Sequence, residues 1–312
     1  MINRRHIRIK VMQSVYAILQ SNSDNLNKEE NFLLGSIDRM YDLYALSLSI
    51  LVNVQEMALS HLEITKKKYL ASSEERDPNT KFTNNQLIAI LKESTSLQQY
   101  LEDKKLNNWK NDNEFVRVIW DLIRESDIYK EYVSTRTSSY EEDKKFVLDV
   151  FKNIIAPNEK LADYFEDQYI GWVDDIPFVN TWIVKTFNTM GPSKAFILGG
   201  LYKDESDQKF VLELFRKVIL NHEKFDEVID TKTPNWDTER IANIDLILMK
   251  MAICEFLHFP LIPTKVSINE YIEIAKDYSS QKSSFFINGV LDKILKDYTQ
   301  SKRIKKIGRG LL

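Results

Sequence analysis

The sequence predicts an all-α protein. Glycine and proline are scarce, with 8 and 7 residues in a chain of 312, whereas a protein built from strands and tight turns needs more of both. Apolar residues recur at spacings of three and four over long stretches, which is the period of one helix face. A chain of this length can bury about 75% of its unfolded surface, and its length is typical of roughly two domains.

The first predicted helix begins directly after Asn3, whose side chain can cap it. Its apolar face has the three-and-four spacing of a helix, and the residues on that face are Ile7, Val11, Val15, Ile18 and Leu19. Arg4 and Arg8 are one turn apart on the opposite side. The pattern predicts an amphipathic helix with positive charge on its first turns.

Positive charge is concentrated at both ends of the chain. Residues 1–23 contain four basic residues and residues 301–312 contain five, with no acid in either segment. Because the whole chain has a net charge of −3, residues 24–300 carry −12. Basic ends on an acidic body favour a polyanionic partner, although ordinary solvated ends would show the same charges. We expect the last segment to be disordered on its own and to add nonspecific attraction, with a helical continuation of the last helix as the alternative.

Further helices are predicted along the middle of the chain. One covers residues 31–61, and a polar segment with Asp77 and Pro78 follows as a loop. Helical patterns resume at 86–94 and 113–125.

Residues 141–172 align without a gap on residues 205–236, which predicts a helical hairpin used twice. Two amphipathic helices of similar composition can also match by chance, so a true duplication of 141–188 as 205–252 stays open. The identical pairs include Phe146/Phe210, Val147/Val211, Leu148/Leu212, Phe151/Phe215, Glu159/Glu223, Lys160/Lys224 and Trp172/Trp236.

The C-terminal part shows three more helices. One runs from about 238 to 258 and ends before Pro260. In the next helix, Ser267 and Glu270 have the spacing of a capping box and predict an N-terminus there. A last helix covers 284–298.

No constellation of catalytic residues stands out. Cys254 and His258 are four residues apart on one predicted helix, but two potential ligands do not make a metal site. The glycines at 199 and 200 lack the lysine of a phosphate-binding loop. We expect no enzymatic activity, no cofactor and no metal, with Cys254 as a core thiol.

The composition favours a soluble cytoplasmic protein without membrane attachment. One cysteine excludes an intramolecular disulfide. Lys10 and Gln13 interrupt the apolar run that a signal peptide would need. The most apolar stretch, 43–54, is shorter than the ~18 residues that span a bilayer.

The segment IPTKVSINEYIEIAKDYSSQKSSFFINGVLDKI, residues 262–294, resembles the closing segment of the NusB family. The matching residues are Pro263, Lys265, Val266, Ile268, Asn269, Glu270, Glu273, Ala275, Lys276, Phe286, Asn288, Gly289, Val290, Leu291, Asp292 and Lys293. The opening RRHIRIKVMQSVYAIL is similar to the arginine-rich first helix of that family, with Gln13 and Tyr16 at its Gln-x-x-Tyr positions. The link SSQK lacks the family's acidic pair, and Phe285 stands where a lysine is frequent.

This resemblance covers residues 1–20 and about 205–296, and it implies two small helical bundles with an inserted helical region. The implied division of the chain has four parts: 1–22 is the arginine-rich first helix, 23–200 is the insertion, whose first part can include the family's second helix, 201–300 is the C-terminal core, and 301–312 is a basic tail.

The family binds the boxA element of ribosomal RNA leader transcripts together with NusE, a small-subunit ribosomal protein, and supports antitermination in the transcription elongation complex. The resemblance therefore implies an RNA-binding antitermination factor. Arginine forks suit phosphates, and aromatic rings stack on unpaired bases, although Tyr278 and Phe286 fit core positions equally well. The implied RNA-binding residues are Arg4, Arg5, Arg8, Lys10, Gln13, Tyr278 and Phe286, and the implied NusE-binding residues are Tyr16 and Asp245.

The sequence bears on two other functions. A helical scaffold that binds only proteins, mainly through the inserted region, remains an alternative. A NusB-like domain fused to an RNA cytosine methyltransferase is excluded, because the sequence has neither a glycine-rich cofactor motif nor a Pro-Cys nucleophile.

Overall fold

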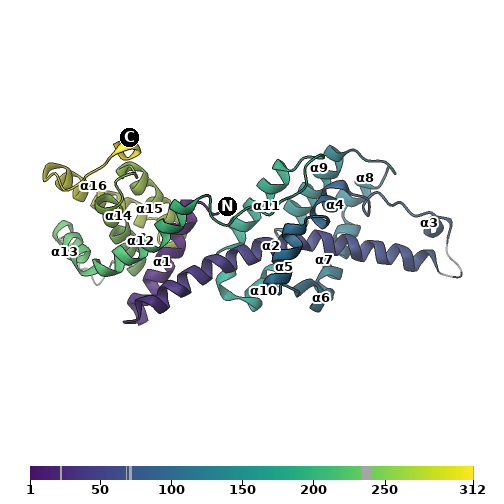
Figure 1. The fold of residues 1–312 in the computed structure, drawn as a ribbon, viewed down its shortest axis with the longest axis horizontal. Helices are drawn as coiled ribbons and strands as arrows, with labels where there is room; N and C mark the ends of the chain where they lie inside the picture. Colours follow the sequence, from purple (N-terminus) through teal and green to yellow (C-terminus); the bar gives the residue numbers. More distant parts are fainter. Residues whose placement is uncertain (22, 68, 70–71, 234–240, 312) are drawn as a thin grey trace. The chain divides into compact units, whose positions relative to one another are not determined.

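The computed structural model confirms the all-α prediction (Figure 1). Within the residues that it describes, every regular element is a helix and none is a strand. The described residues are 1–21, 23–67, 69, 72–233 and 241–311. They form two compact units, which we call unit 1 (Met1–Ile37 with Gly200–Leu312) and unit 2 (Asp38–Gly199).

Unit 1 combines the beginning and the end of the chain. Its helices are α1 (Arg4–Ser21), the start of α2 (Leu26–Lys66), α12 (Glu205–Leu220), α13 (His222–Lys232), α14 (Asn243–His258), α15 (Thr264–Tyr278), α16 (Ser283–Gln300) and the short 3₁₀ turn η4 (Gly308–Leu311). The central helix is α14, whose residues from Ile247 to Phe256 are buried on all its faces. A helix that is buried all round is surrounded by neighbours, and α1, α12, α13, α15 and α16 pack against it.

Helix α1 forms as its sequence predicts. The Asn3 side chain accepts a hydrogen bond from the backbone N–H of His6 at 2.9 Å, which caps the helix N-terminus. Ile7, Val11 and Val15 are fully buried. Their burial, at about 1.5–3 kcal/mol for each side chain, holds α1 in unit 1.

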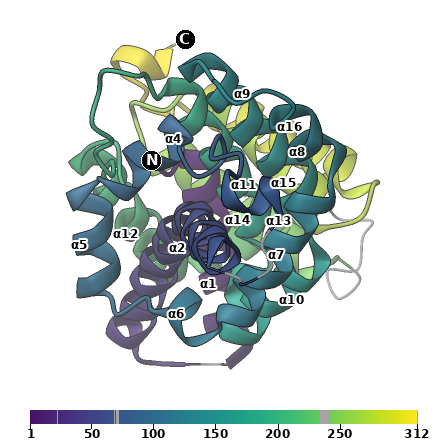
Figure 2. The ribbon, with the colours of Figure 1, turned by 90° about the vertical axis from the view of Figure 1, so that its right-hand side faces the viewer.

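Unit 2 contains the rest of α2 and the helices that follow it. These are α3 (Ser73–Arg76), α4 (Gln86–Lys92), α5 (Thr95–Asp103), α6 (Asn108–Asn111), α7 (Asn113–Glu125), α8 (Asp127–Tyr132), α9 (Tyr140–Val150), the π turn η1 (Phe151–Ile155), α10 (Glu159–Gln168), the 3₁₀ turn η2 (Ile170–Trp172) and α11 (Ile176–Thr189). Figure 2 looks along α2.

Aromatic side chains fix α2 in the core of unit 2. The Trp109 indole N–H donates to the backbone carbonyl of Leu46 at 2.9 Å. On another part of the helix, Tyr44 stacks on Trp182 with ring centroids 4.1 Å apart. Such pairs add about 0.5–1.5 kcal/mol to the burial of the rings.

The apolar part of α2 is longer than the sequence analysis expected. An 18-residue window of this helix is apolar enough to cross a bilayer, so the expectation that the stretch is too short is wrong. However, 67% of that window is buried inside the protein. The core helix of a soluble protein passes the same test, so this observation is weak evidence for a membrane segment.

Both copies of the predicted repeat form two consecutive helices, α9 and α10 in the first copy and α12 and α13 in the second. The pair Phe146 and Phe210 is equally buried, as are Phe151 and Phe215. Trp236 lies outside the described residues, and so does the predicted start of the next helix at 238. The duplication itself stays open, because similar burial also follows from similar amphipathic patterns.

Candidate nucleic-acid interface

A groove of about 630 Å³ lies in unit 1 at the N-terminal end of α1. We call it the N-terminal groove. Its apolar lining comes from the α14–α15 connection and the first turn of α15, and its charged lining comes from α1, α15 and the last residues of the chain. The lining residues are Asn3, Arg4, Arg5, His6, Arg8, Leu261, Ile262, Pro263, Val266, Glu270 and Arg309.

Arg8 points into unit 1 and forms a buried ion pair with Glu255. Its Nε and Nη2 donate to the two carboxylate oxygens of Glu255 at 2.7 and 3.0 Å, and the two residues are 2% and 0% exposed. Ser267 and Tyr271 donate to the same carboxylate at 2.6 and 2.7 Å. The expectation that Arg8 lies on the outward side of the helix is therefore wrong, because α14 and α15 cover that side.

The Glu255 carboxylate also explains why the expected N-cap at Ser267 is wrong. Ser267 is not an N-cap, because α15 begins three residues earlier, at Thr264. The buried Ser267 hydroxyl donates a hydrogen bond to the Glu255 carboxylate. The spacing of Ser267 and Glu270 predicts a capping box, but the Ser267 hydroxyl donates instead to the buried Glu255 carboxylate of α14.

Burial and mutual attraction act in opposite directions on this pair. Burial by itself lowers the pKa of Arg8, but the Glu255 carboxylate offsets it and the net pKa is raised. Burial likewise favours the protonated form of Glu255, yet Arg8, Ser267 and Tyr271 hold its pKa below the usual value. Both groups are therefore charged at neutral pH. Burial raises the pKa of Tyr271 far above 10, so Tyr271 remains a donor.

Arg4 and Arg5 lie at the surface of the groove, and each has an internal partner. Arg4 Nε is 2.8 Å from the Asp207 carboxylate, and its guanidinium lies over the Phe210 ring. Arg5 donates two hydrogen bonds of 2.9 Å to Glu270, which raises its pKa. The side chains of Arg4 and Arg5 are 39% and 41% exposed, so each keeps donors that face solvent.

The net charge of the groove is smaller than its arginine content suggests. The three arginines of α1 face three carboxylates, which are Asp207, Glu255 and Glu270. Burial, Arg5 and Lys10 lower the pKa of His6 to about 4, so His6 is neutral at pH 7. Among the described residues that line the groove, Arg309 is therefore the guanidinium without a carboxylate partner.

Four other predicted RNA-binding residues lie outside the groove lining. Lys10 is buried in α1, and Gln13 is half-buried on the same helix. Tyr278 and Phe286 are half-buried at the end of α15 and the first turn of α16, next to the strongly exposed ring of Phe285. Contacts of these four residues with RNA stay a prediction.

The two predicted partner residues differ in exposure. Tyr16 on α1 is 41% exposed. Asp245, in the first turn of α14, is 5% exposed, and its Oδ1 accepts no hydrogen bond from any residue that the structure describes. A buried carboxylate oxygen without a donor is uncommon in folded proteins.

The tail is ordered in the structure, so the expectation of a disordered segment is wrong for its described part, 301–311. Lys306 Nζ donates to the backbone carbonyls of Glu255 and Phe259, each at 2.9 Å. These carbonyls belong to the C-terminal end of α14, where a cation is favourable. The backbone N–H of Ile307 donates to the Pro260 carbonyl at 3.1 Å.

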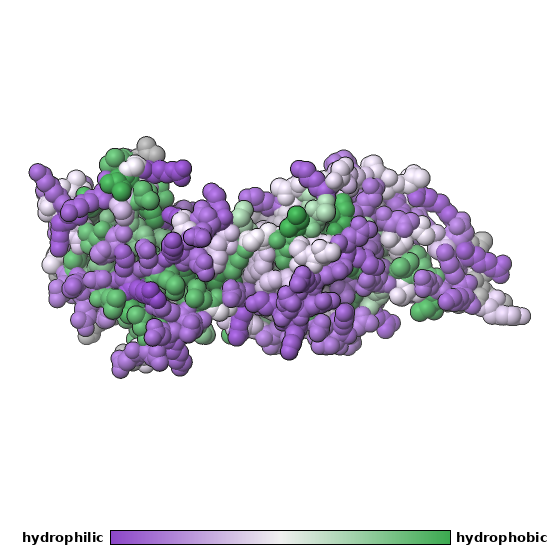
Figure 3. All heavy atoms as spheres, viewed as in Figure 1, coloured by the Kyte–Doolittle hydropathy of each residue, from purple (hydrophilic) through white to green (hydrophobic). Residues whose placement is uncertain are grey.

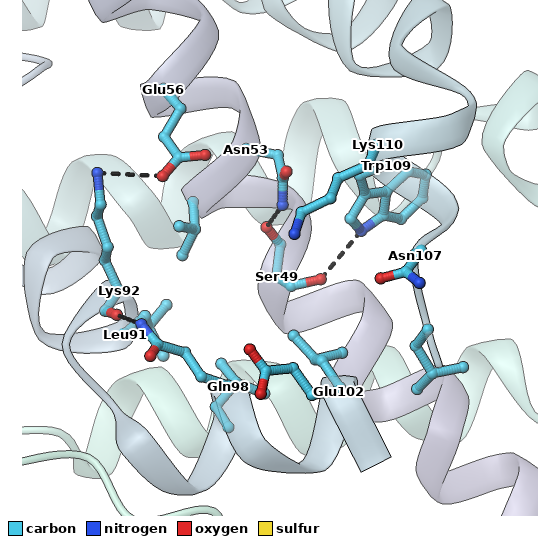
Figure 4. A pocket seen from close by; sticks show the side chains of 14 residues that line it. Ser49, Asn53, Glu56, Leu91, Lys92, Gln98, Glu102, Asn107, Trp109 and Lys110 are labelled. Carbon is cyan, nitrogen blue, oxygen red and sulfur yellow. Dashed lines mark hydrogen bonds and ion pairs between the residues drawn. The ribbon is translucent and has the colours of Figure 1, made fainter. Parts of the chain in front are cut away.

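A second cavity, of about 240 Å³, lies in unit 2 between α2, α4, α5 and α6. Glu102 and Lys110 point toward it in Figure 4. Elsewhere in its wall, Lys92 pairs with Glu56 at 3.1 Å. No sequence pattern predicts this cavity, because its walls come from four helices with no shared motif. No cluster of three or more potential metal ligands occurs in the described part of the chain.

The fold and the groove define an all-α protein whose first helix borders a groove with exposed guanidinium groups. The chain belongs to the NusB family. The family model matches residues 188–296, which include α12 to α15 and most of α16.

Three relatives carry the name transcription antitermination protein NusB. That of Salinibacter ruber is 46% identical over 112 residues, which are 36% of this chain and 70% of the relative. That of Chloroherpeton thalassium is 40% identical over 120 residues, 38% of this chain and 57% of the relative. That of Acetivibrio thermocellus is 39% identical over 93 residues, 30% of this chain and 64% of the relative.

The match therefore spans less than two thirds of the second and third relatives, and the chain is longer than all three. No solved structure matches the chain.

Proposed function

We propose that this protein is a cytoplasmic, non-enzymatic RNA-binding factor for transcription antitermination. It would bind boxA-type leader RNA together with the small-subunit ribosomal protein NusE, within the transcription elongation complex. The observation that carries the proposal is the match of 188–296 to the NusB family, together with relatives named for antitermination.

The N-terminal groove is the proposed RNA site. Arg4 and Arg5 each keep part of a guanidinium in solvent while a carboxylate holds the rest of the side chain. Such pairing fixes the fork of donors in one orientation, so less rotamer entropy is lost when a phosphate binds. Arg8 serves this site indirectly, since its ion pair with Glu255 positions the helix that carries the other two arginines.

The proposed ribosomal-protein surface includes Tyr16 and Asp245. The Asp245 oxygen that has no donor among the described residues is a natural acceptor for a basic partner. Unsatisfied buried acceptors cost about 1–3 kcal/mol, and a donor from a docked protein would remove that cost. The support is thus the buried Asp245 oxygen, which accepts no hydrogen bond within the described part of the chain.

The division of the chain into 1–22, 23–200, 201–300 and 301–312 also remains a proposal. The two units support it in part, because Gly200 begins the C-terminal part of unit 1. The first residues of α2, up to Ile37, belong to unit 1, which agrees with a family helix inside the segment 23–200.

Fluorescence anisotropy with a labelled boxA-type RNA tests the proposal. The control RNA has the same composition in permuted order, and both are titrated at several salt concentrations with and without the ribosomal protein. We expect tighter binding of the boxA-type RNA and a further gain when the protein is added. Equal, weak binding of both RNAs would reject the proposal, and retention of the ribosomal protein alone would favour the scaffold function.

A further inference from the structure

The last residues of the chain are held against the α14–α15 connection by two kinds of contact. Lys306 reaches the carbonyls that end α14, and Ile307 donates to the carbonyl of Pro260. The bonds of Lys306 join a segment near the C-terminus to residues 51 and 47 positions earlier in the sequence, at the end of α14 and the start of the connection. The tail is thereby placed beside the N-terminal groove, whose lining includes Arg309.

Two glycines allow this approach. Gly308 has a φ of +52°, a conformation that side chains rarely adopt. At Gly310, a Cβ atom would lie 1.9 Å from the carbonyl oxygen of Pro260. Any larger residue at 310 would thus have to move the tail away from the groove.

Arg309 stands between these two glycines and lines the groove. It is exposed, and no described carboxylate pairs with it, whereas Arg4, Arg5 and Arg8 are each paired. The groove lining and its ion-pair partners contain four guanidinium groups and three carboxylates. Its net positive charge is therefore that of a single arginine, supplied by the tail.

We propose that Arg309 is a phosphate-binding residue, fixed by the anchored tail so that it binds a phosphodiester of single-stranded RNA in the N-terminal groove. This inference rests on the proposed RNA-binding function and adds to it a contact outside the arginine-rich first helix. The apolar residues Leu261, Pro263 and Val266 line the same groove, and a guanidinium bound to a phosphate forms a charge-assisted hydrogen bond.

The test compares three variants of the full-length chain in binding to the boxA-type RNA. Arg309→Ala removes the contact, and Gly310→Ala displaces the tail without changing any charge. Arg303→Ala is the matched control, because Arg303 is an exposed tail arginine that lies over the Tyr298 ring and does not line the groove. Circular dichroism and thermal unfolding check that each variant is folded.

An ordered contact predicts that Arg309→Ala and Gly310→Ala both weaken RNA binding about tenfold and lower the salt slope by about 0.7. Arg303→Ala should change affinity less than threefold. Equal losses of RNA affinity for Arg303→Ala and Arg309→Ala would reject the inference, because the tail would then attract RNA nonspecifically. RNA binding of wild-type strength by the Gly310→Ala variant would also reject it.

A further outcome distinguishes this inference from the proposed function. If the Arg309→Ala variant lost ribosomal-protein binding but kept its RNA binding, the groove would be assigned to a protein partner. That result would reject the inference and leave the proposed function standing. Absence of RNA binding by the wild-type chain would reject both the inference and the function on which it rests.

Discussion

Arg8 on α1 and Glu255 on α14 form a two-point ion pair, with donor–acceptor distances of 2.7 and 3.0 Å, in the interior of unit 1. The two residues are 247 positions apart in the sequence. Because Ser267 and Tyr271 also donate to Glu255, this carboxylate joins α1, α14 and α15.

Breaking this pair should destabilise unit 1. Arg8→Met would leave the Glu255 charge buried without its counter-charge, and we expect a loss of about 3–5 kcal/mol in the free energy of unfolding. Urea unfolding followed by circular dichroism measures it. Arg5→Met, at the exposed pair with Glu270, is the control and should cost less than about 1 kcal/mol. Equal losses for both variants would contradict the structural role of Arg8.

The stability of unit 1 should depend on pH through His6. Burial, Arg5 and Lys10 lower its pKa to about 4, while Glu270 acts in the opposite direction, and the unfolded value is about 6.5. The unfolded chain therefore binds more protons between pH 4 and 6.5, so this contribution to stability is lost as the pH falls through that window.

Comparison with His6→Gln isolates this effect from the titration of carboxylates. We expect the wild-type chain to lose up to about 2–3 kcal/mol more than the variant between pH 6.5 and 4. Parallel pH profiles of the two proteins, measured by urea unfolding at fixed ionic strength, would show that His6 is not held neutral.

Arg5 should contribute to RNA binding through phosphate contact. Arg5→Ala is expected to weaken binding of all single-stranded RNAs and to lower the salt slope by about 0.7. Arg117→Ala removes an exposed arginine from α7 in unit 2 and serves as the control. An unchanged slope for Arg5→Ala would exclude the start of α1 from the RNA site.

Asp245 should matter more for partner binding than for stability. Because its Oδ1 has no donor among the described residues, Asp245→Asn should leave the free energy of unfolding unchanged or raise it slightly. Asp245→Lys should abolish association with the ribosomal protein, since breaking a buried interface pair costs about 2–5 kcal/mol.

The control for this surface is Asp292→Asn, at an exposed position of α16. Isothermal titration with the purified ribosomal protein measures the effect. Full-strength binding by a folded Asp245→Lys variant would remove this residue from the interface.

Local sequence signals predicted the parts of the fold that depend on neighbours in the chain. The Asn3 cap and the buried stripe of α1 follow directly from residue type and spacing. The inward position of Arg8 could not be predicted in this way, because its partner Glu255 is 247 residues away. In the sequence, Glu255 is an acidic residue within a largely apolar helix, with no pattern that links it to Arg8.

The groove was predicted only in part. Arginines at the start of α1 indicated where a polyanion could bind, but the carboxylates that neutralise them come from α12, α14 and α15. The anchoring of the tail by Lys306 and Ile307 was also not predicted. Gly308 and Gly310 were its only local signal, and a pair of glycines near a chain end is equally typical of a flexible segment.

Unit 1 is assembled from two stretches of the chain, with all of unit 2 between them. During translation, α1 leaves the ribosome early, but α12, α14 and α15 are encoded after Gly200. At about 5–20 residues per second, roughly 15–60 s pass between the synthesis of Ser21 and that of the last part of unit 1. Ribosome-bound chains in which a flexible linker follows residue 199 and fills the exit tunnel should therefore show a protease-resistant unit 2 and a cleavable α1. Throughout that interval the apolar stripe of α1 lacks its partners, so nascent chains are open to capture by a chaperone until the final helices emerge.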